Sequence, residues 1–137
     1  MKKSIYITDF DMRRFKWLAN NAAKFDELYK KNIYRLEKEL EKALIVEPKE
    51  IPPSVITMYT TYKIKDLATD KENTYTLVFP FDADTGQNKI SILTQIGVSS
   101  IGLSSGDVIE FEDASGKRKI EIVEIIYQPE REGLFYS

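Results

Sequence analysis

The stretch LTQIGVSSIGLSSGDVIEF, residues 93–111, contains three glycines and four serines and ends in an apparent β-strand. Glycines near serines can form a phosphate-binding loop, but they also occur at tight turns. The stretch contains neither GxxxxGKS/T nor GxGxxG, and no lysine follows that could reach a phosphate. We therefore interpret Gly97, Gly102 and Gly106 as positions that need unusual backbone angles or close packing. Asp107 then begins a strand after a turn.

The segments on both sides of this stretch have the composition of β-strands. They are rich in β-branched and aromatic residues, and several alternate apolar with polar positions. Short turns, DADTGQN and DASGKR, join them, and IGVSSIGLSSG has room for one helical turn. We predict a small, mostly antiparallel sheet with one connecting helix. Its strands are VITMYTTYKIKDL (55–67), NTYTLVFPF (73–81), KISIL (89–93), DVIEFED (107–113) and RKIEIVEIIYQ (118–128).

The N-terminal part of the chain predicts two helices instead. Residues 8–46 contain no glycine and no proline. Thr8 can cap a first helix, and Asn20 and Asn21 tolerate the left-handed backbone of a turn. The second helix has apolar residues at coiled-coil spacings of 4, 3, 4 and 3. We predict an antiparallel hairpin with arms of roughly 12 and 20 residues, or about 18 and 30 Å. The apolar seam consists of Tyr29, Ile33, Leu36, Leu40 and Ala43.

Three of the five prolines lie in VEPKEIPPS, residues 46–54. Prolines end helices and stiffen the chain. The sequence therefore predicts an α+β protein with three parts: a helical hairpin (1–47), a proline-rich hinge (48–54) and a β domain (55–137).

The composition argues against an enzyme. The chain has no cysteine, and therefore no disulfide or thiol nucleophile. It has no histidine, the commonest general base and metal ligand. We expect a non-enzymatic cytoplasmic protein without a cofactor or metal of its own. A net charge of −2 gives no general attraction to nucleic acid or to membranes. Residues 1–7 are too short for a signal peptide, and no apolar run approaches membrane-spanning length.

Two acidic segments are candidate metal sites. The run from Asp82 invites a calcium interpretation, but glycine falls at its fifth position and Leu93 at its twelfth, which does not fit an EF-hand loop. A hairpin turn accounts for it better. Asp26 and Glu27 lie at the predicted hairpin tip. They either complement the dipole of the second helix or could hold Mg²⁺ in the active site of a partner.

One basic and aromatic segment is a candidate nucleic-acid site. Arg13, Arg14, Phe15, Lys16 and Trp17 spread around several faces of a helix, so they form no continuous stripe for phosphates. We therefore expect no direct sequence-specific binding to nucleic acid. Trp17 is better explained as an anchor between the hairpin and the rest of the protein.

The order of these parts resembles the bacterial Gre transcription factors and, more closely, their short relative, the regulator of nucleoside diphosphate kinase. The start IYITDFDMRRF, the end EIIYQPE, and the order IS, IG, IGL, GD between them carry the resemblance. It covers nearly the whole chain. One departure is Gln95, which stands where the family usually has proline.

The resemblance implies an FKBP-like C-terminal domain that binds RNA polymerase at the rim of its secondary channel. It aligns the polymerase-docking loop with Leu93, Thr94, Gln95 and Ile96. In Gre factors a long coiled coil places an acidic tip and a magnesium ion at the polymerase active centre, and transcript cleavage follows. The predicted hairpin resembles that of the short relative, which competes for the channel without reaching the centre. DNA binding is implied only at the level of the family, and we expect a monomer.

Two other functions stay open at this point. FKBP-like domains include peptidyl-prolyl isomerases, whose pocket usually has a tryptophan floor. The only tryptophan here, Trp17, is in the hairpin, which counts against an isomerase. The family name suggests a modulator of nucleoside diphosphate kinase, and the sequence offers no physical argument for or against it.

Overall fold

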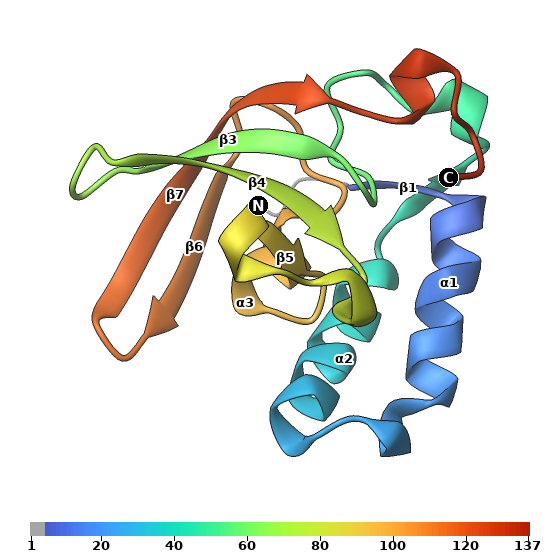
Figure 1. The fold of residues 1–137 in the computed structure, drawn as a ribbon, viewed down its shortest axis with the longest axis horizontal. Helices are drawn as coiled ribbons and strands as arrows, with labels where there is room; N and C mark the ends of the chain where they lie inside the picture. The colour runs from blue at the N-terminus through green and yellow to red at the C-terminus, as the bar shows by residue number, and fades with distance from the viewer. Residues whose placement is uncertain (1–4) are drawn as a thin grey trace.

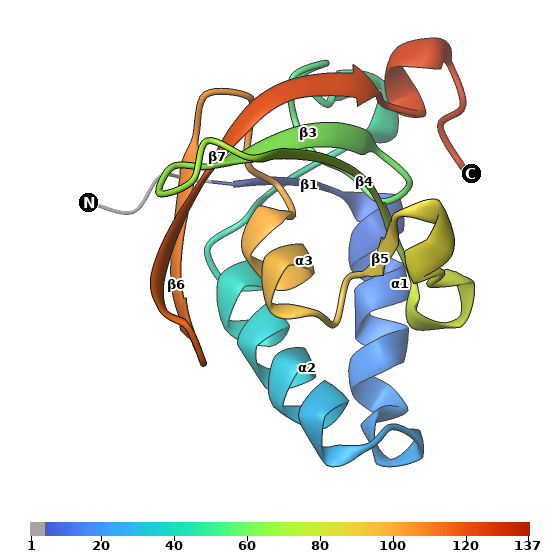
Figure 2. The same ribbon diagram turned by 60° about the vertical axis from the view of Figure 1, so that its left-hand side comes forward.

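The computed structural model describes residues 5–137, and the region of the signal-peptide prediction lies partly outside them. A five-stranded sheet curls over one short helix, α3, and a helical hairpin extends from beneath it (Figures 1 and 2). The fold is therefore α+β, as predicted. The helices are α1 (Asp9–Asn20), α2 (Glu27–Leu40) and α3 (Gln95–Ser100); the strands are β1 (Tyr6–Thr8), β2 (Leu44–Val46), β3 (Thr61–Asp66), β4 (Glu72–Val78), β5 (Lys89–Ser91), β6 (Val108–Asp113) and β7 (Gly116–Tyr127).

The first arm of the hairpin forms as its capping residues predict. Thr8 Oγ1 accepts a hydrogen bond from the backbone N–H of Asp11 at 3.0 Å. The helix ends at Asn20, and the side chain of Asn21 donates to the carbonyl of Trp17 at 2.8 Å. A short 3₁₀ turn (Ala22–Lys24) completes the tip. These contacts satisfy backbone groups that a helix end otherwise leaves without partners.

The second arm is shorter than predicted, at 14 residues instead of 20. Residues after Leu40 leave the helix because the backbone of β2 pairs in parallel with β1, with Leu44 opposite Tyr6 and Val46 opposite Thr8. This two-stranded ribbon closes the base of the hairpin. Ile33 and Leu36 of the predicted seam are buried, whereas Leu40 and Ala43 are half-buried.

The five-stranded sheet has the order β5-β4-β3-β7-β6, and its three pairings among β3, β4, β6 and β7 are antiparallel. The β4–β5 pair is parallel, so the prediction of a β-hairpin turn in the run from Asp82 is wrong. The chain crosses between these strands through two 3₁₀ turns, Pro80–Asp82 and Thr85–Gln87, and only the local bridge of Asp84 with Lys89 is antiparallel.

The predicted strand at 55–67 begins only at Thr61. Its first half is held by irregular contacts: Ile56 donates to the carbonyl of Leu103 at 2.8 Å, and Tyr59 donates to that of Leu77 at 2.6 Å. Tyr59 also has a φ of 65°, which a strand does not allow. Residues 55–60 therefore form an irregular segment that leads into β3, the central strand of the sheet.

One hydrophobic core joins the hairpin to the sheet. It contains Phe15 and Leu18 of α1, Ile33 and Leu36 of α2, and the inner side chains of the sheet and α3, which include Tyr62, Leu77, Val98, Ile120 and Ile122. Burial of this apolar surface is the main stabilising contribution to the fold. Within residues 5–137, no helix combines the length and apolar character needed to cross a membrane.

Candidate functional site

The predicted docking loop, which consists of Leu93, Thr94, Gln95 and Ile96, leads from β5 into α3. Thr94 is the N-cap of α3: its hydroxyl accepts from the N–H of Gly97 at 3.1 Å and donates to the carbonyl of Ser91 at 2.7 Å. Gln95 Nε2 donates to the carbonyl of Glu112 on β6 at 3.1 Å. The loop therefore has a fixed shape, and Thr94, Gln95 and Ile96 are half-buried at the surface.

Leu93 differs from the other three residues of the docking loop because its side chain is fully buried. Its carbonyl accepts a hydrogen bond from Asn32 Nδ2 of α2 at 2.5 Å. Sequence reasoning missed Asn32. The available signal was an amide next to Ile33 on the apolar side of a helix, where a polar residue needs a partner.

The glycines of the 93–111 stretch have the structural roles that the sequence predicted. A Cβ on Gly97 would lie 2.4 Å from the carbonyl oxygen of Ser91, so only glycine fits there. Gly102 has a φ of +80°, and a Cβ would lie 2.7 Å from Ile5 Cβ. The two residues let α3 and the following turn pack directly against β5 and the N-terminal segment.

A hollow of about 290 Å³ adjoins the docking loop. Its apolar wall consists of half-buried side chains of the sheet and of Ile96, and Arg118 lies at its rim; the apolar residues are Tyr75, Ile90, Ile96 and Phe111. Arg118 donates to Asp66 at 2.9 Å and to Asp113 at 3.1 Å. Its hydrogen bond lowers the pKa of Asp113 below the ordinary value. The docking loop and this hollow form one continuous surface that could accept an apolar side chain of a partner.

The hairpin tip carries Asp26 and Glu27, both exposed. Asp26 is the N-cap of α2 and accepts from the N–H of Tyr29 at 3.0 Å. Glu27 is in the first turn, with its carboxylate 3.3 Å from Lys30 Nζ. Both positions complement the helix dipole. No group of three or more potential metal ligands occurs within residues 5–137.

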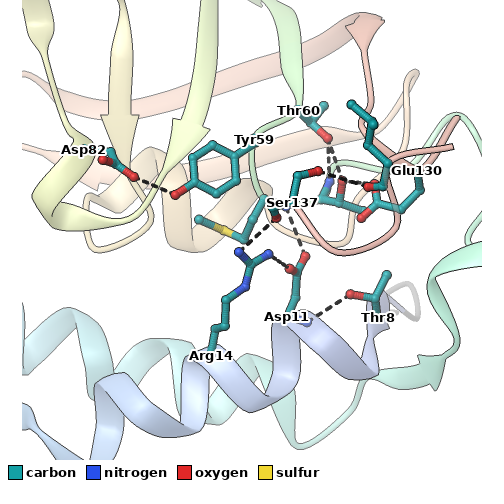
Figure 3. Close-up of polar contacts among 11 residues, drawn as sticks. Thr8, Asp11, Arg14, Tyr59, Thr60, Asp82, Glu130 and Ser137 are labelled. Atoms are coloured by element: carbon teal, nitrogen blue, oxygen red, sulfur yellow. Dashed lines mark hydrogen bonds and ion pairs between the residues drawn. The ribbon is translucent and has the colours of Figure 1, made fainter. Parts of the chain in front are cut away.

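A polar network joins α1 to the β part (Figure 3). The buried carboxylate of Asp11 pairs with Arg14 and accepts from the N–H of Met58 at 3.1 Å. Burial raises the pKa of Asp11, although Arg14 opposes this effect. The hydroxyl of Tyr59 donates to Asp82 at 2.6 Å, and burial, together with Asp82, raises the pKa of Tyr59 to about 12. The Asp11–Met58 hydrogen bond attaches the hairpin to the loop before β3, and the Tyr59–Asp82 hydrogen bond holds that loop to the segment after β4.

The C-terminal segment adds a third acid near this network. Glu130 accepts a hydrogen bond from the hydroxyl of Thr57 at 2.7 Å, and burial raises its pKa. Thr57 is in turn held by Thr60, whose hydroxyl accepts from the N–H of Thr57 at 3.0 Å. The segment after β7 is thereby attached to residues 57–60.

Trp17 is half exposed, at 51%. It lines a shallow groove with Arg14, Leu18, Phe79 and Phe81, so on α1 it faces the segment after β4. Arg13 and Lys16 are exposed elsewhere on α1.

Comparisons with known proteins agree with this architecture. Residues 38–127 match the family described as transcription elongation factor GreA/GreB, C-terminal part. Residues 3–46 match the family described as Rnk N-terminus. A solved structure, the prokaryotic transcription elongation factor GreA/GreB from Nitrosomonas europaea, is 37% identical with a TM-score of 0.74; the match covers 92% of this chain and all of that one.

Curated relatives carry the same two names. Transcription elongation factor GreA of Clostridium botulinum is 38% identical over 93 residues, which are 68% of this chain and 58% of that protein. The chain thus spans less than two thirds of the length of that relative. The regulator of nucleoside diphosphate kinase of Escherichia coli is 32% identical over 99 residues, which are 72% of this chain and 73% of that protein.

The resemblance inferred from the sequence is confirmed by these matches. The C-terminal match includes β3 to β7 and the docking loop, and the N-terminal match includes the hairpin. The chain belongs to the GreA/GreB family of transcription elongation factors, and its N-terminal hairpin lies within the segment that matches the Rnk N-terminus family.

Proposed function

We propose that this protein is a non-enzymatic transcription regulator that binds RNA polymerase at the rim of the secondary channel. It docks through Thr94, Gln95 and Ile96 and competes there with Gre factors, without stimulating transcript cleavage. The observation that carries this proposal is a combination: a GreA/GreB C-terminal match over residues 38–127 and a short N-terminal hairpin.

The hairpin dimensions support occupancy of the channel without chemistry. At 1.5 Å per residue, the 12 residues of α1 and the 14 residues of α2 extend about 18 and about 21 Å. Part of this length is packed against α3 and the sheet through Ile33 and Leu36. The free reach of the tip is therefore shorter than the helices themselves.

The docking surface supports recognition of a protein partner. Ile96 is half-buried beside the hollow that contains Phe111, and Arg118 at the rim is already paired with two carboxylates. An apolar patch with satisfied charges at its edge is typical of a protein interface.

The test is a binding measurement between the full-length protein and purified core RNA polymerase. Gln95→Asp combined with Ile96→Asp places two carboxylates on the patch, and we expect binding at least about tenfold weaker, as for loss of an interface anchor. Val123→Asp is the matched control, because Val123 is an exposed apolar residue on β7, outside the docking loop. Equal affinity of the double variant and the control would contradict the docking assignment.

A second candidate function follows from one relative. The Escherichia coli protein at 32% identity is named a regulator of nucleoside diphosphate kinase, so this chain is also a candidate modulator of that kinase. Purified kinase assayed with and without excess protein would test it. Unchanged kinase activity, together with binding to polymerase, would favour the first function alone.

A further inference from the structure

Asn32 is a buried polar residue that joins the hairpin to the docking loop. Its exposure is only 4%. Nδ2 donates to the carbonyl oxygen of Leu93, 61 residues further along the chain, at 2.5 Å. Within residues 5–137, its Oδ1 has no hydrogen-bond partner. The amide thus makes one long-range hydrogen bond through Nδ2, and its Oδ1 has no hydrogen-bond partner in the described part of the chain.

The carbonyl that Asn32 holds is at a sensitive position in the backbone. Leu93 is the first residue of the predicted docking loop and directly precedes Thr94, the N-cap of α3. The remaining contacts of the cap lie within the segment itself: Thr94 N–H donates to Ser91 O at 3.0 Å, and Val98 N–H donates to Thr94 O at 2.9 Å. Asn32 therefore adds a directional hydrogen bond from α2 to the apolar packing of Leu93 against Ile33 and Leu36.

Packing alone does not account for an amide at position 32. The neighbouring Ile33, Leu36 and Leu93 belong to the hydrophobic core, where an aliphatic side chain would avoid the desolvation of an unpaired oxygen. Without the amide, the buried Leu93 carbonyl would lose its donor, and such a group is costly to leave unpaired. The amide at position 32 therefore holds the Leu93 carbonyl in a defined orientation, at some cost in packing energy.

We propose that Asn32 is a positioning residue for the polymerase-docking loop. Its hydrogen bond to the Leu93 carbonyl holds the loop in the conformation that binds the partner. The hairpin then has a second role besides occupying a channel, because it sets the shape of the docking surface. This inference rests on the proposed function for its consequence in binding, but the structural coupling stands on the contacts above.

Coupling between two parts of a protein is reciprocal. If α2 stabilises the loop, a partner that binds the ordered loop stabilises α2 in return. Bound polymerase should therefore slow hydrogen exchange in the middle of α2, including the amides near Asn32, and not only in the docking loop.

The experiment uses the full chain and three variants. Asn32→Leu keeps a similar volume but removes the donor, Asn32→Ala removes both, and Leu36→Ala weakens the same core without touching the Leu93 carbonyl. Amide hydrogen exchange is measured at Thr94, Gly97 and Val98, and at Ile120 in β7 as an internal reference. Thermal unfolding and polymerase affinity are measured in parallel.

We expect Asn32→Leu to unfold at a higher temperature than Asn32→Ala. Even so, exchange at Thr94 and Gly97 should be about tenfold faster than in the unsubstituted protein, relative to Ile120, which is the loss of one hydrogen bond. Polymerase affinity should fall by a similar factor in both Asn32 variants. Leu36→Ala should lower the unfolding temperature without this local increase in exchange.

Unchanged loop exchange in Asn32→Leu would overturn the proposal, because a residue that fills space equally well would then suffice. An equal local increase in Leu36→Ala would overturn it as well. If the unsubstituted protein does not bind polymerase, the proposed function fails, and the exchange measurements still decide whether Asn32 positions the loop.

Discussion

Gly97, directly after the predicted docking loop, has no room for a side chain. Its helical position would ordinarily favour alanine by about 1 kcal/mol, but a Cβ would lie 2.4 Å from Ser91 O and 2.9 Å from Ile92 Cα. Both neighbours are backbone atoms, so neither can move without shifting β5. Steric contact therefore outweighs helix propensity at this position.

We predict that Gly97→Ala lowers the free energy of unfolding by about 3 kcal/mol, the upper part of the range for overpacked sites. Gly106→Ala is the matched comparison, because Gly106 has a φ of +94° but open space around it. Only backbone strain of about 1 kcal/mol is expected there. Urea denaturation of both variants measures the difference, and equal losses would contradict the steric explanation.

Glu130 gives a prediction for pH. Burial raises its pKa above the ordinary value of 4.5, so the folded protein binds this proton more tightly than the unfolded chain. The contribution of Glu130 to stability therefore falls as pH rises from about 4.5 through the raised pKa, and it stays unfavourable above that value.

Glu130→Gln should consequently stabilise the protein at pH 7, because the amide oxygen can still accept from Thr57 without a buried charge. We expect a gain of only about 0.5 kcal/mol, since Glu130 is partly exposed to solvent that screens its charge. The gain should nearly vanish near pH 4, where Glu130 is mostly protonated in both the folded and the unfolded protein. Thermal unfolding at the two pH values checks this, and a larger gain at pH 4 would reverse the sign of the argument.

At the scale of elements, the sequence predicted the helix ends that depend on residues close in sequence. Thr8 caps α1 through its hydroxyl, and the chain turns after Asn20, because side chains within a few residues satisfy the helix ends. The end of α2 was not predictable in this way. Residues 41–46 contain no glycine or proline that would stop a helix, but the backbone of residues 44–46 pairs with residues 6–8, which are far away in sequence.

The same distinction explains the sheet. Strand composition located β6 and β7 to within about two residues, whereas Tyr59 and the parallel β4–β5 pair depend on contacts between distant segments. The resemblance to the family predicted the four residues of the docking loop. The structure shows that Leu93 is buried, whereas Thr94, Gln95 and Ile96 are half-buried. Asn32 required the fold itself, because its partner is 61 residues away.

The shared core leads to a prediction about the two largest parts of the chain. Phe15, Leu18, Ile33 and Leu36 pack in one cluster with the sheet, and Asp11 joins α1 to Met58. We expect the hairpin and the β part to unfold together, as small single-core proteins do. Trp17 fluorescence, which reports on the hairpin, and far-ultraviolet circular dichroism should give one urea midpoint. Two separate midpoints would show that the hairpin and the β part are independent domains.

At the scale of the whole molecule, the distance from the docking loop to the hairpin tip decides between competition and catalysis. Carboxylates assist a metal-dependent cleavage only when they bind the ion directly or through one water, and a displacement of about 1 Å already reduces such effects severely. With arms of about 18 and 21 Å that are partly packed against α3, Asp26 and Glu27 have little free reach. We therefore expect the tip to enter the channel without completing a catalytic site.

Backtracked transcription complexes test this expectation. The protein alone should not accelerate transcript cleavage, and in excess it should slow the cleavage that a Gre factor stimulates. Asp26→Asn combined with Glu27→Gln removes both tip charges, while asparagine still serves as a helix N-cap, so the hairpin stays folded. Because the proposed docking residues are Thr94, Gln95 and Ile96 and not the tip, this variant should compete within about twofold of the unsubstituted protein, a difference below 0.5 kcal/mol. The opposite result would be that the unsubstituted protein stimulates cleavage and the double variant does not. It would mean that the tip reaches the active centre and that the short arms do not prevent catalysis.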